Sequence, residues 1–366
     1  MKKRLVKIFV PLLALLIVTF LGVFPAPIVA DQASQDKTMD FMEQVLPIDL
    51  SKYNINLKTD STRNGTPPFF DDNRKVTDLY YELSSESSMV YVDFRIEKDT
   101  IICCAVYPTE GQAITNKQYT NLYDAVTDFL KTYQTYAKID SNNLMAMLNN
   151  VDLNKNSTIT TENIKLTITT TPYPSLESNV ITFRWVQVIN GAEYPSMELI
   201  FDKDKCLFFS VGDDRLLYKL GDTSVNISEE QAINIAVENL KNYSYEMADG
   251  SIVKDFDVSN YGWVAELKTA PFDYVDYELR PYWDVRIFFD EIYPGNVFAI
   301  STFIWANTGE IISCGNMATG GTYNIDDINF SGAGASSSPD NTLVFVGVAV
   351  VAVVVAALAI SVIVKK

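Results

Sequence analysis

A turn between two β-rich runs occurs three times along this chain, and this internal repeat constrains the fold more than any other feature of the sequence. The turns begin at Glu97, Asp202 and Ala306, so they are 105 and then 104 residues apart. A period of this kind indicates duplicated structural units. The strand-like runs that flank the turns cover residues 89–96 and 101–107, 197–201 and 206–211, and 298–305 and 310–314.

A segment of helical periodicity precedes the strands of each unit, and the apolar residues of each segment form one stripe. The pattern therefore predicts an α+β fold of tandem units, in which one helix packs on a sheet of about four antiparallel strands. We expect unit boundaries at 31–115, 116–220 and 221–330, and each sheet leaves its other face for a neighbour or a ligand. The stripes are Met39, Met42, Val45 and Leu46, then Leu122, Ala125, Val126, Phe129, Leu130 and Tyr133, then Ile233, Ala236, Val237 and Leu240.

The two ends of the chain predict export and a membrane anchor. Residues 1–30 have the basic start, the apolar stretch and the small residues Ala26 and Ala30 that are typical of a signal peptide, although an uncleaved anchor has the same pattern. Residues 343–364 form an apolar run of bilayer length, followed by a cytoplasmic tail of two lysines at 365–366. We therefore expect a single-pass protein at the cell surface, with its N-terminus outside, its C-terminus in the cytoplasm, and a Ser/Gly linker at 331–342.

The composition excludes several classes of function. All 46 acidic residues lie between residues 31 and 342, whereas six of the 29 Lys and Arg residues lie outside this range. The predicted ectodomain therefore carries a net charge near −23. Such an acidic ectodomain does not favour nucleic acid as a partner. The chain has no histidine, which excludes Ser-His-Asp and Cys-His catalysis and the common zinc sites. We therefore expect no enzyme and no cofactor.

The four cysteines fit no metal-binding spacing. Two of them are adjacent, so on a strand they would point to opposite faces of the sheet. In an exported chain, the sequence is compatible both with free thiols and with a native disulfide. The cysteines are Cys103, Cys104, Cys206 and Cys314.

The third unit resembles the PepSY domains over about residues 225–316. Residues 227–236, with the letters ISEEQAINIA, are similar to the opening helix of that family. Residues 280–285 resemble its central strand, and residues 308–311 resemble the turn before its last strand. The resemblance implies a binding or inhibitory module of secreted and cell-envelope proteins, including propeptides that restrain peptidases, without catalytic residues.

One loop resembles an EF-hand calcium loop over residues 152–163. Its oxygen donors occupy positions 1, 3, 5 and 9 of the motif, but Ser157 replaces the usual glycine and Asn163 replaces the bidentate glutamate. A polar loop leading into a strand explains the same letters, and we favour that interpretation, with no metal bound. The calcium-ligand candidates are Asp152, Asn154, Asn156 and Thr160.

Two other sequence patterns mark surface positions. Five sequons are glycosylation candidates in an exported chain. Four pairs of adjacent carboxylates occur, and solvated turn residues explain them better than acid–base catalysis does. The sequon asparagines are Asn64, Asn156, Asn226, Asn242 and Asn329, and the pairs are Asp71-Asp72, Asp213-Asp214, Asp290-Glu291 and Asp326-Asp327.

These features favour a membrane-anchored extracellular binding module. It would bind or restrain an envelope protein such as a peptidase, through an open sheet edge or a free sheet face. A carboxylate-using surface hydrolase and a structural component of the envelope are the alternatives.

Overall fold

The structure is a computed structural model that describes residues 32–64, 75–173, 178–272 and 276–318. The predicted signal peptide, linker, membrane span and tail lie outside these residues, as do Asn329 and the pairs at 71–72 and 326–327. Among the described residues, no helix has the length and apolar character that crossing a bilayer requires. The fold is α+β with mostly antiparallel strands, as the sequence predicts.

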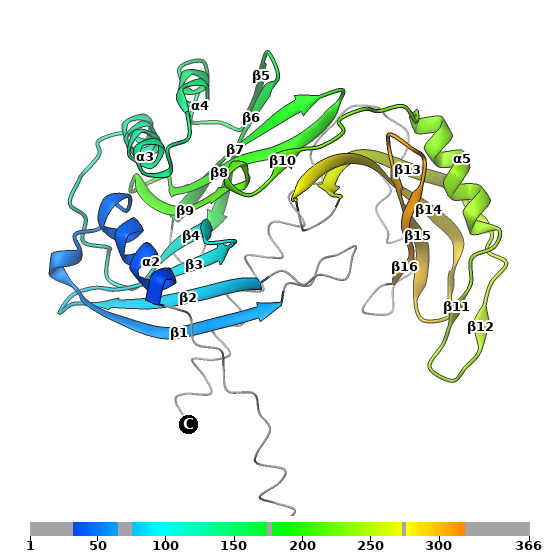
Figure 1. The fold of residues 1–366 in the computed structure, drawn as a ribbon, viewed down its shortest axis with the longest axis horizontal. Helices are drawn as coiled ribbons and strands as arrows, with labels where there is room; N and C mark the ends of the chain where they lie inside the picture. Colours follow the sequence, from blue (N-terminus) through cyan, green and yellow to red (C-terminus); the bar gives the residue numbers. More distant parts are fainter. Residues whose placement is uncertain (1–31, 65–74, 174–177, 273–275, 319–366) are drawn as a thin grey trace, which may run out of the picture. The chain divides into compact units, whose positions relative to one another are not determined.

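Nine strands form one sheet in the order β1-β2-β3-β4-β9-β8-β7-β6-β5 (Figure 1). All of its strand pairs are antiparallel. The strands are β1 (Asn54–Asn64), β2 (Lys75–Ser84), β3 (Met89–Glu97), β4 (Thr100–Glu110), β5 (Ser157–Thr161), β6 (Ile164–Tyr173), β7 (Ser178–Ile189), β8 (Ala192–Asp202) and β9 (Leu207–Asp213).

Helices α2 (Gln32–Gln44) and α3 (Leu122–Ala137), with the short helix α4 (Asn142–Leu148), cover one face of this sheet. Helix α3 begins where the Asn121 side chain accepts a hydrogen bond from the Asp124 amide, and it ends at Lys138 in a left-handed conformation. The predicted stripe of α3 is buried in one hydrophobic core with alternate residues of β2–β4 and β6–β9. Of the first predicted stripe, Met42, Val45 and Leu46 are buried in the same core, but Val45 and Leu46 follow the end of α2, and Met39 is only partly buried.

The first two predicted units share this single sheet, so the prediction of a separate sheet for each of them is wrong. The last strand of the first unit, β4, pairs with the last strand of the second, β9. Cys104 lies opposite Val211 at the centre of this short antiparallel ladder, and both side chains are buried in the common core. The pairing satisfies the backbone groups of two strand edges that would otherwise be open.

The remaining strands form a sheet of five, in the order β10-β14-β15-β16 with β13 also paired to β14, and a separate β11-β12 ribbon. The pair β10-β14 is parallel. Helix α5 (Glu229–Leu240) buries Ala232, Ile233, Ala236 and Leu240. The strands are β10 (Lys219–Leu220), β11 (Tyr245–Glu246), β12 (Ile252–Val253), β13 (Val258–Pro271), β14 (Glu278–Tyr293), β15 (Val297–Trp305) and β16 (Ile311–Ala318).

The described residues separate into two compact units, and strands β13, β14, β15 and β16 each begin in one unit and end in the other. The larger unit holds the described residues up to Ser228 with Leu267–Trp283 and Ile304–Ser313. The smaller unit holds Glu229–Glu266, Asp284–Phe303 and the described residues from Cys314.

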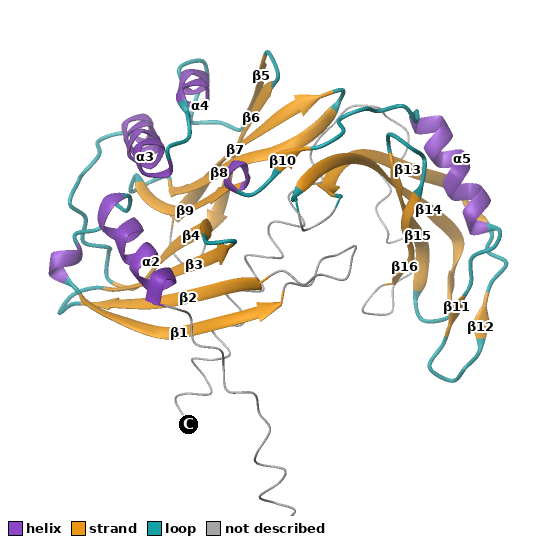
Figure 2. Cartoon of the chain, in the orientation of Figure 1, coloured by secondary structure: helices purple, strands orange, loops and turns teal. Residues whose placement is uncertain are grey.

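A helix followed by four strands of one sheet occurs three times in chain order (Figure 2). These are α2 with β1–β4, α3 with β6–β9, and α5 with β13–β16. Each last hairpin contains a residue with positive φ, namely Asp99 at 57°, Cys206 at 54° and Gly309 at 78°. The superposition of the three hairpins stays a prediction.

Candidate functional site

The nine-stranded sheet has a polar face, opposite α2 and α3, and this face is the candidate site. Its residues alternate along the strands with the core residues, as in β3, where Val90, Val92 and Phe94 are buried and the residues between them are not. One row of directly opposed residues crosses six strands of this face. The row consists of Asp78, Arg95, Cys103, Gly212, Glu198 and Arg184, on β2, β3, β4, β9, β8 and β7.

Opposite charges are neighbours on both sides of the β4-β9 joint. In the first half, Arg95 Nε donates to Asp78 Oδ1 at 3.0 Å. In the second half, Arg184 lies opposite Glu198, and its Nη1 is 3.9 Å from Glu193 Oε2. Lys165 Nζ also donates to Glu193, at 2.6 Å. The face therefore offers both signs of charge to a flat partner surface.

Three carboxylates of this region have raised pKa values. Burial raises the pKa of Asp93 to about 6, and the nearby Asp78 carboxylate adds to the shift. Burial likewise raises the pKa of Asp214 to about 6, with contributions from Asp213 and Glu198. The pKa of Glu198 is raised by burial and partly lowered by Arg184. These side chains are poorly hydrated for a surface, which is a property of interfaces and of acid–base sites.

Aromatic rings lie beside the charges of the first half. Tyr80 and Tyr91 stack with their ring centroids 4.9 Å apart, and the Tyr91 hydroxyl donates to Glu82 at 3.2 Å. Tyr107, opposite Tyr91, packs edge-on against Phe209 at 5.1 Å. Tyrosine and arginine are enriched at protein interfaces, so the polar face has the composition of a binding surface.

The calcium-like loop does not lead into a helix, because β5 and β6 follow it. Asp152 Oδ1 accepts a hydrogen bond from the Asn154 amide at 3.0 Å, and Lys155 Nζ lies 3.5 Å from Asp152 Oδ2. Asn156 Oδ1 accepts a hydrogen bond from the Thr170 amide at 2.7 Å, and Thr160 lies on β5. Within the described residues, no group of three or more His, Cys, Asp or Glu residues is arranged for a metal. That this loop binds no metal stays a prediction.

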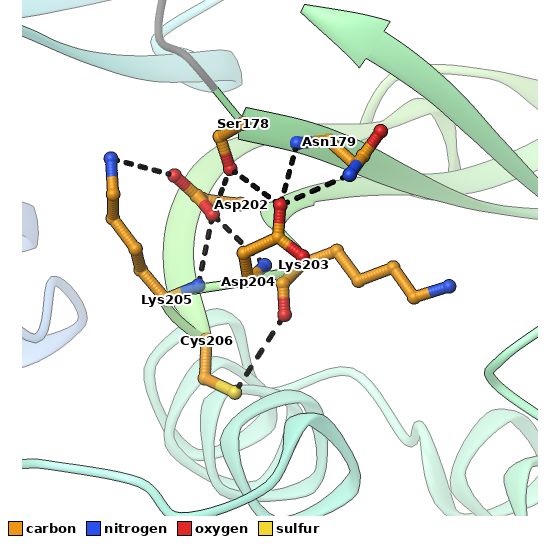
Figure 3. A network of polar contacts seen from close by, with 7 residues as sticks. All are labelled: Ser178, Asn179, Asp202, Lys203, Asp204, Lys205 and Cys206. Carbon is orange, nitrogen blue, oxygen red and sulfur yellow. Dashed lines mark hydrogen bonds and ion pairs between the residues drawn. The ribbon is translucent and has the colours of Figure 1, made fainter.

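The turn between β8 and β9 is held by two aspartates (Figure 3). Asp202 Oδ1 accepts hydrogen bonds from the amides of Asp204 and Lys205, both at 3.0 Å, and from the Ser178 hydroxyl at 2.5 Å. Asp204 Oδ2 accepts the Asn179 amide at 2.9 Å. These contacts bind the turn to the start of β7, so the network stabilises the hairpin. Asp202 Oδ1 already accepts three hydrogen bonds within this network.

The remaining candidate residues are dispersed. Asn64 ends β1, and Asn156, Asn226 and Asn242 are exposed. Asn226 Nδ2 donates to the Asn307 carbonyl at 3.0 Å, so a glycan there would replace this contact. Asp290 and Glu291 are exposed, as predicted, but they lie within strand β14 and not in a turn.

The Asp213-Asp214 pair is divided between two environments. Asp213 is buried and receives Arg215 Nε at 2.9 Å and Nη2 at 2.8 Å. Asp214 lies at the polar face with its raised pKa. All four cysteines are free thiols.

The row on the polar face is absent from the sequence predictions. The sequence does contain a signal for this row, because charged residues alternate with apolar ones along the strands. These charged residues are Asp93 and Arg95 on one strand and Arg184 and Glu198 on two others. Their assembly into one row depends on the β4-β9 pairing, and no local pattern predicts that pairing.

Neither a family model nor a curated protein matches the chain. Among solved structures, the chain is similar to the Bacillus megaterium YpeB C-terminal domain, with 15% sequence identity and a TM-score of 0.28. The match covers 80% of this chain and 100% of that domain.

Proposed function

We propose that the protein is a membrane-anchored extracellular binding module, and that the polar face of its nine-stranded sheet binds another envelope protein. The row of paired opposite charges carries this proposal. A sheet face with both signs of charge, half-buried carboxylates and stacked tyrosines fits a protein surface better than a small molecule.

The location rests on the ends of the chain. A signal peptide at 1–30 and a span at 343–364 would place the described residues outside the cell, with a linker too short to carry them far from the bilayer. The resemblance of residues 225–316 to PepSY domains supports the class of function, since that family includes modules that restrain peptidases. A peptidase of the envelope is therefore the first partner to seek.

The experiment is affinity capture with the full-length tagged protein, expressed in its own cells and solubilised in mild detergent. The test variant is Arg95→Gln with Arg184→Gln, which removes one cation from each half of the row. The control is Lys155→Gln with Lys241→Gln, which changes the net charge equally at exposed positions. We expect a specific partner with the natural protein and the control, and its loss with the test variant.

Retention of the partner by the test variant, at the level of the control, would exclude the polar face as the binding surface. Absence of any specific partner for the natural protein would contradict the binding function itself.

The raised carboxylate pKa values favour one alternative, a carboxylate-using hydrolase. The Glu198 carboxylate contributes to the raised pKa of Asp214, and a group with a pKa near 6 can exchange protons at neutral pH. The test is hydrolysis of casein and of nitrophenyl glycosides between pH 4 and 8 by the natural protein and by Asp214→Asn. Activity that disappears in Asp214→Asn would support the hydrolase, and inactivity of the natural protein would leave the binding function preferred.

A further inference from the structure

The charges in the row across the polar face are antisymmetric about the joint between β4 and β9, whose place in the sheet can be followed in Figure 1. At each step outward from this joint, the two matching positions carry opposite charges or no charge. The half row on one side of the joint is therefore complementary in charge to the half row on the other side. The matching pairs are Cys103 with Gly212, Arg95 with Glu198, Asp78 with Arg184, and Ser61 with Thr167.

The charged groups of this row keep unused hydrogen-bonding capacity. Among the described residues, the side chains of Glu198 and Arg184 form no hydrogen bond, although they lie opposite each other on neighbouring strands. Arg95 donates from its Nε atom, to Asp78, and it is exposed. Burial raises the pKa of Glu198, so a further guanidinium close to this carboxylate would stabilise its ionised form. Guanidinium groups with unused donors can bind carboxylates of another molecule.

The order of these charges selects one way in which two copies of the chain can meet through this face. Two sheets that face each other are related by a two-fold axis that lies between them. With the axis along the strands at the joint, Arg95 of one copy faces Glu198 of the other, and Asp78 faces Arg184. With the axis along the row, each charged residue would face its own copy. Electrostatic complementarity therefore favours the axis along the strands.

The centre of this arrangement is uncharged and open. A Cβ atom at Gly212 would have the Ile102 carbonyl oxygen as its nearest atom outside the neighbouring residues, at 3.9 Å. In the two-fold arrangement, Cys103 of each copy lies over Gly212 of the other, and the bare backbone leaves room for the thiol side chain. The charged pairs then lie on both sides of a neutral centre.

We propose that the polar face binds the same face of a second copy of this chain, about a two-fold axis along β4 and β9. The inference rests on the proposed function, because it names one occupant of the same binding surface. Each contact occurs twice in a symmetric dimer, so the Arg95–Glu198 and Arg184–Asp78 pairs would each form twice. Another envelope protein would compete with the second copy for the face.

The experiment is sedimentation equilibrium of the full-length protein in density-matched detergent, over a range of protein concentrations. The test variants are Arg95→Glu and Glu198→Arg, first separately and then mixed in equal amounts. Each variant alone places like charges opposite each other in the dimer. In the mixture, the two substituted positions face each other, and the natural pair is kept at the other site. The controls are Lys155→Glu and Glu238→Arg, which change the net charge equally at exposed positions outside the row.

We expect dimers of the natural protein and of both controls, and self-association at least about a hundredfold weaker for each test variant alone. The mixture should form dimers again, because both of its facing pairs are attractive. Circular dichroism checks that the variants fold. If either test variant does not fold, Asp78→Arg and Arg184→Glu replace the two, since these positions also face each other in the dimer.

Three results would overturn the proposal. These are a monomeric natural protein, equal self-association of the test and control variants, and a mixture of folded test variants that stays monomeric. The proposed function is decided separately by the capture experiment. A monomeric natural protein that still captures another protein through Arg95 and Arg184 would refute the dimer alone, whereas a dimer that captures no other protein would contradict the proposed function alone.

Discussion

The polar face of the nine-stranded sheet disfavours the ionised form of Asp93. Asp93 lies on β3 opposite Tyr80 and is flanked on its face by Tyr91 and Arg95. Burial raises its pKa to about 6, and the Arg95 charge offsets this only in part. An ionised carboxylate in this place is less stable than in water, so Asp93 costs stability at neutral pH.

The sign of the resulting pH dependence follows from proton linkage. Between pH 4 and 6 the folded protein binds more protons at Asp93 than the unfolded chain does, so the free energy of unfolding falls as pH rises through this range. Asp93→Asn should therefore stabilise the protein at pH 8, by on the order of 1 kcal/mol after solvent screening, and should flatten the dependence.

Urea unfolding at pH 5 and pH 8 measures this effect, with the exposed Asp255→Asn as control. A fall in stability of Asp93→Asn at pH 8 would contradict the cause assigned to the shift.

The contacts of single residues in the calcium-like loop lead to a second prediction. Asp152 already accepts the Asn154 amide, and Asn156 is engaged with β6, so the candidate ligands do not converge on one point. We expect calcium binding no tighter than about millimolar. Isothermal titration checks this, and micromolar affinity that disappears in Asp152→Ala would show the prediction to be wrong.

At the scale of elements, the main finding is the ladder between β4 and β9. It joins strands of the first two repeats, so α2 and α3 pack on one continuous core that contains both Phe94 and Trp185. Two helix-and-sheet units that share a core should lose their structure together, because each depends on side chains of the other.

A core substitution in the first repeat should therefore destabilise the second. Phe94 is fully buried on β3, and Phe94→Ala should cost about 3–5 kcal/mol. Hydrogen exchange of the β7 amides around Trp185 should accelerate in this variant, although β7 belongs to the second repeat. Glu110→Ala at the exposed end of β4 is the control. Unchanged exchange in β7 would mean that the two repeats open independently.

Helix α5 provides the matching test in the third repeat. Leu240 is 7% exposed at the end of its buried stripe, and Leu240→Ala should cost about 2–5 kcal/mol in the part of the protein that contains this helix. Glu238→Ala, with its side chain 70% exposed, serves as the control on the same helix. Urea unfolding distinguishes them, and equal stability of the two variants would contradict the packing of α5 through its apolar stripe.

At the scale of the whole molecule, the proposed topology places every described residue outside the cell. Residues 343–364 would hold the protein in the membrane, and the polar face would then meet other molecules of the envelope. Partner binding at this face would depend on charge, so salt should weaken it.

The topology itself is tested by protease added to intact cells. We expect the protease to remove the part between the leader and residue 342, because exposed loops outside the membrane are accessible to cleavage. Cytoplasmic marker proteins should stay intact in the same sample. Protection of this part of the chain until the cells are lysed would contradict the proposed location.

The amino-acid sequence by itself determined the α+β class, the period of the repeat and the order of a helix before its strands. These properties are local, since the spacing of apolar residues reports which side of each helix or strand is buried. The burial of Leu130 on α3 and of Trp185 on β7 follows from such spacing. Only the tertiary structure decided that β4 pairs with β9, because every strand edge offers the same backbone donors and acceptors. That choice assembles Arg95, Cys103 and Glu198 into one row, so the candidate surface depends on contacts between residues far apart in the chain.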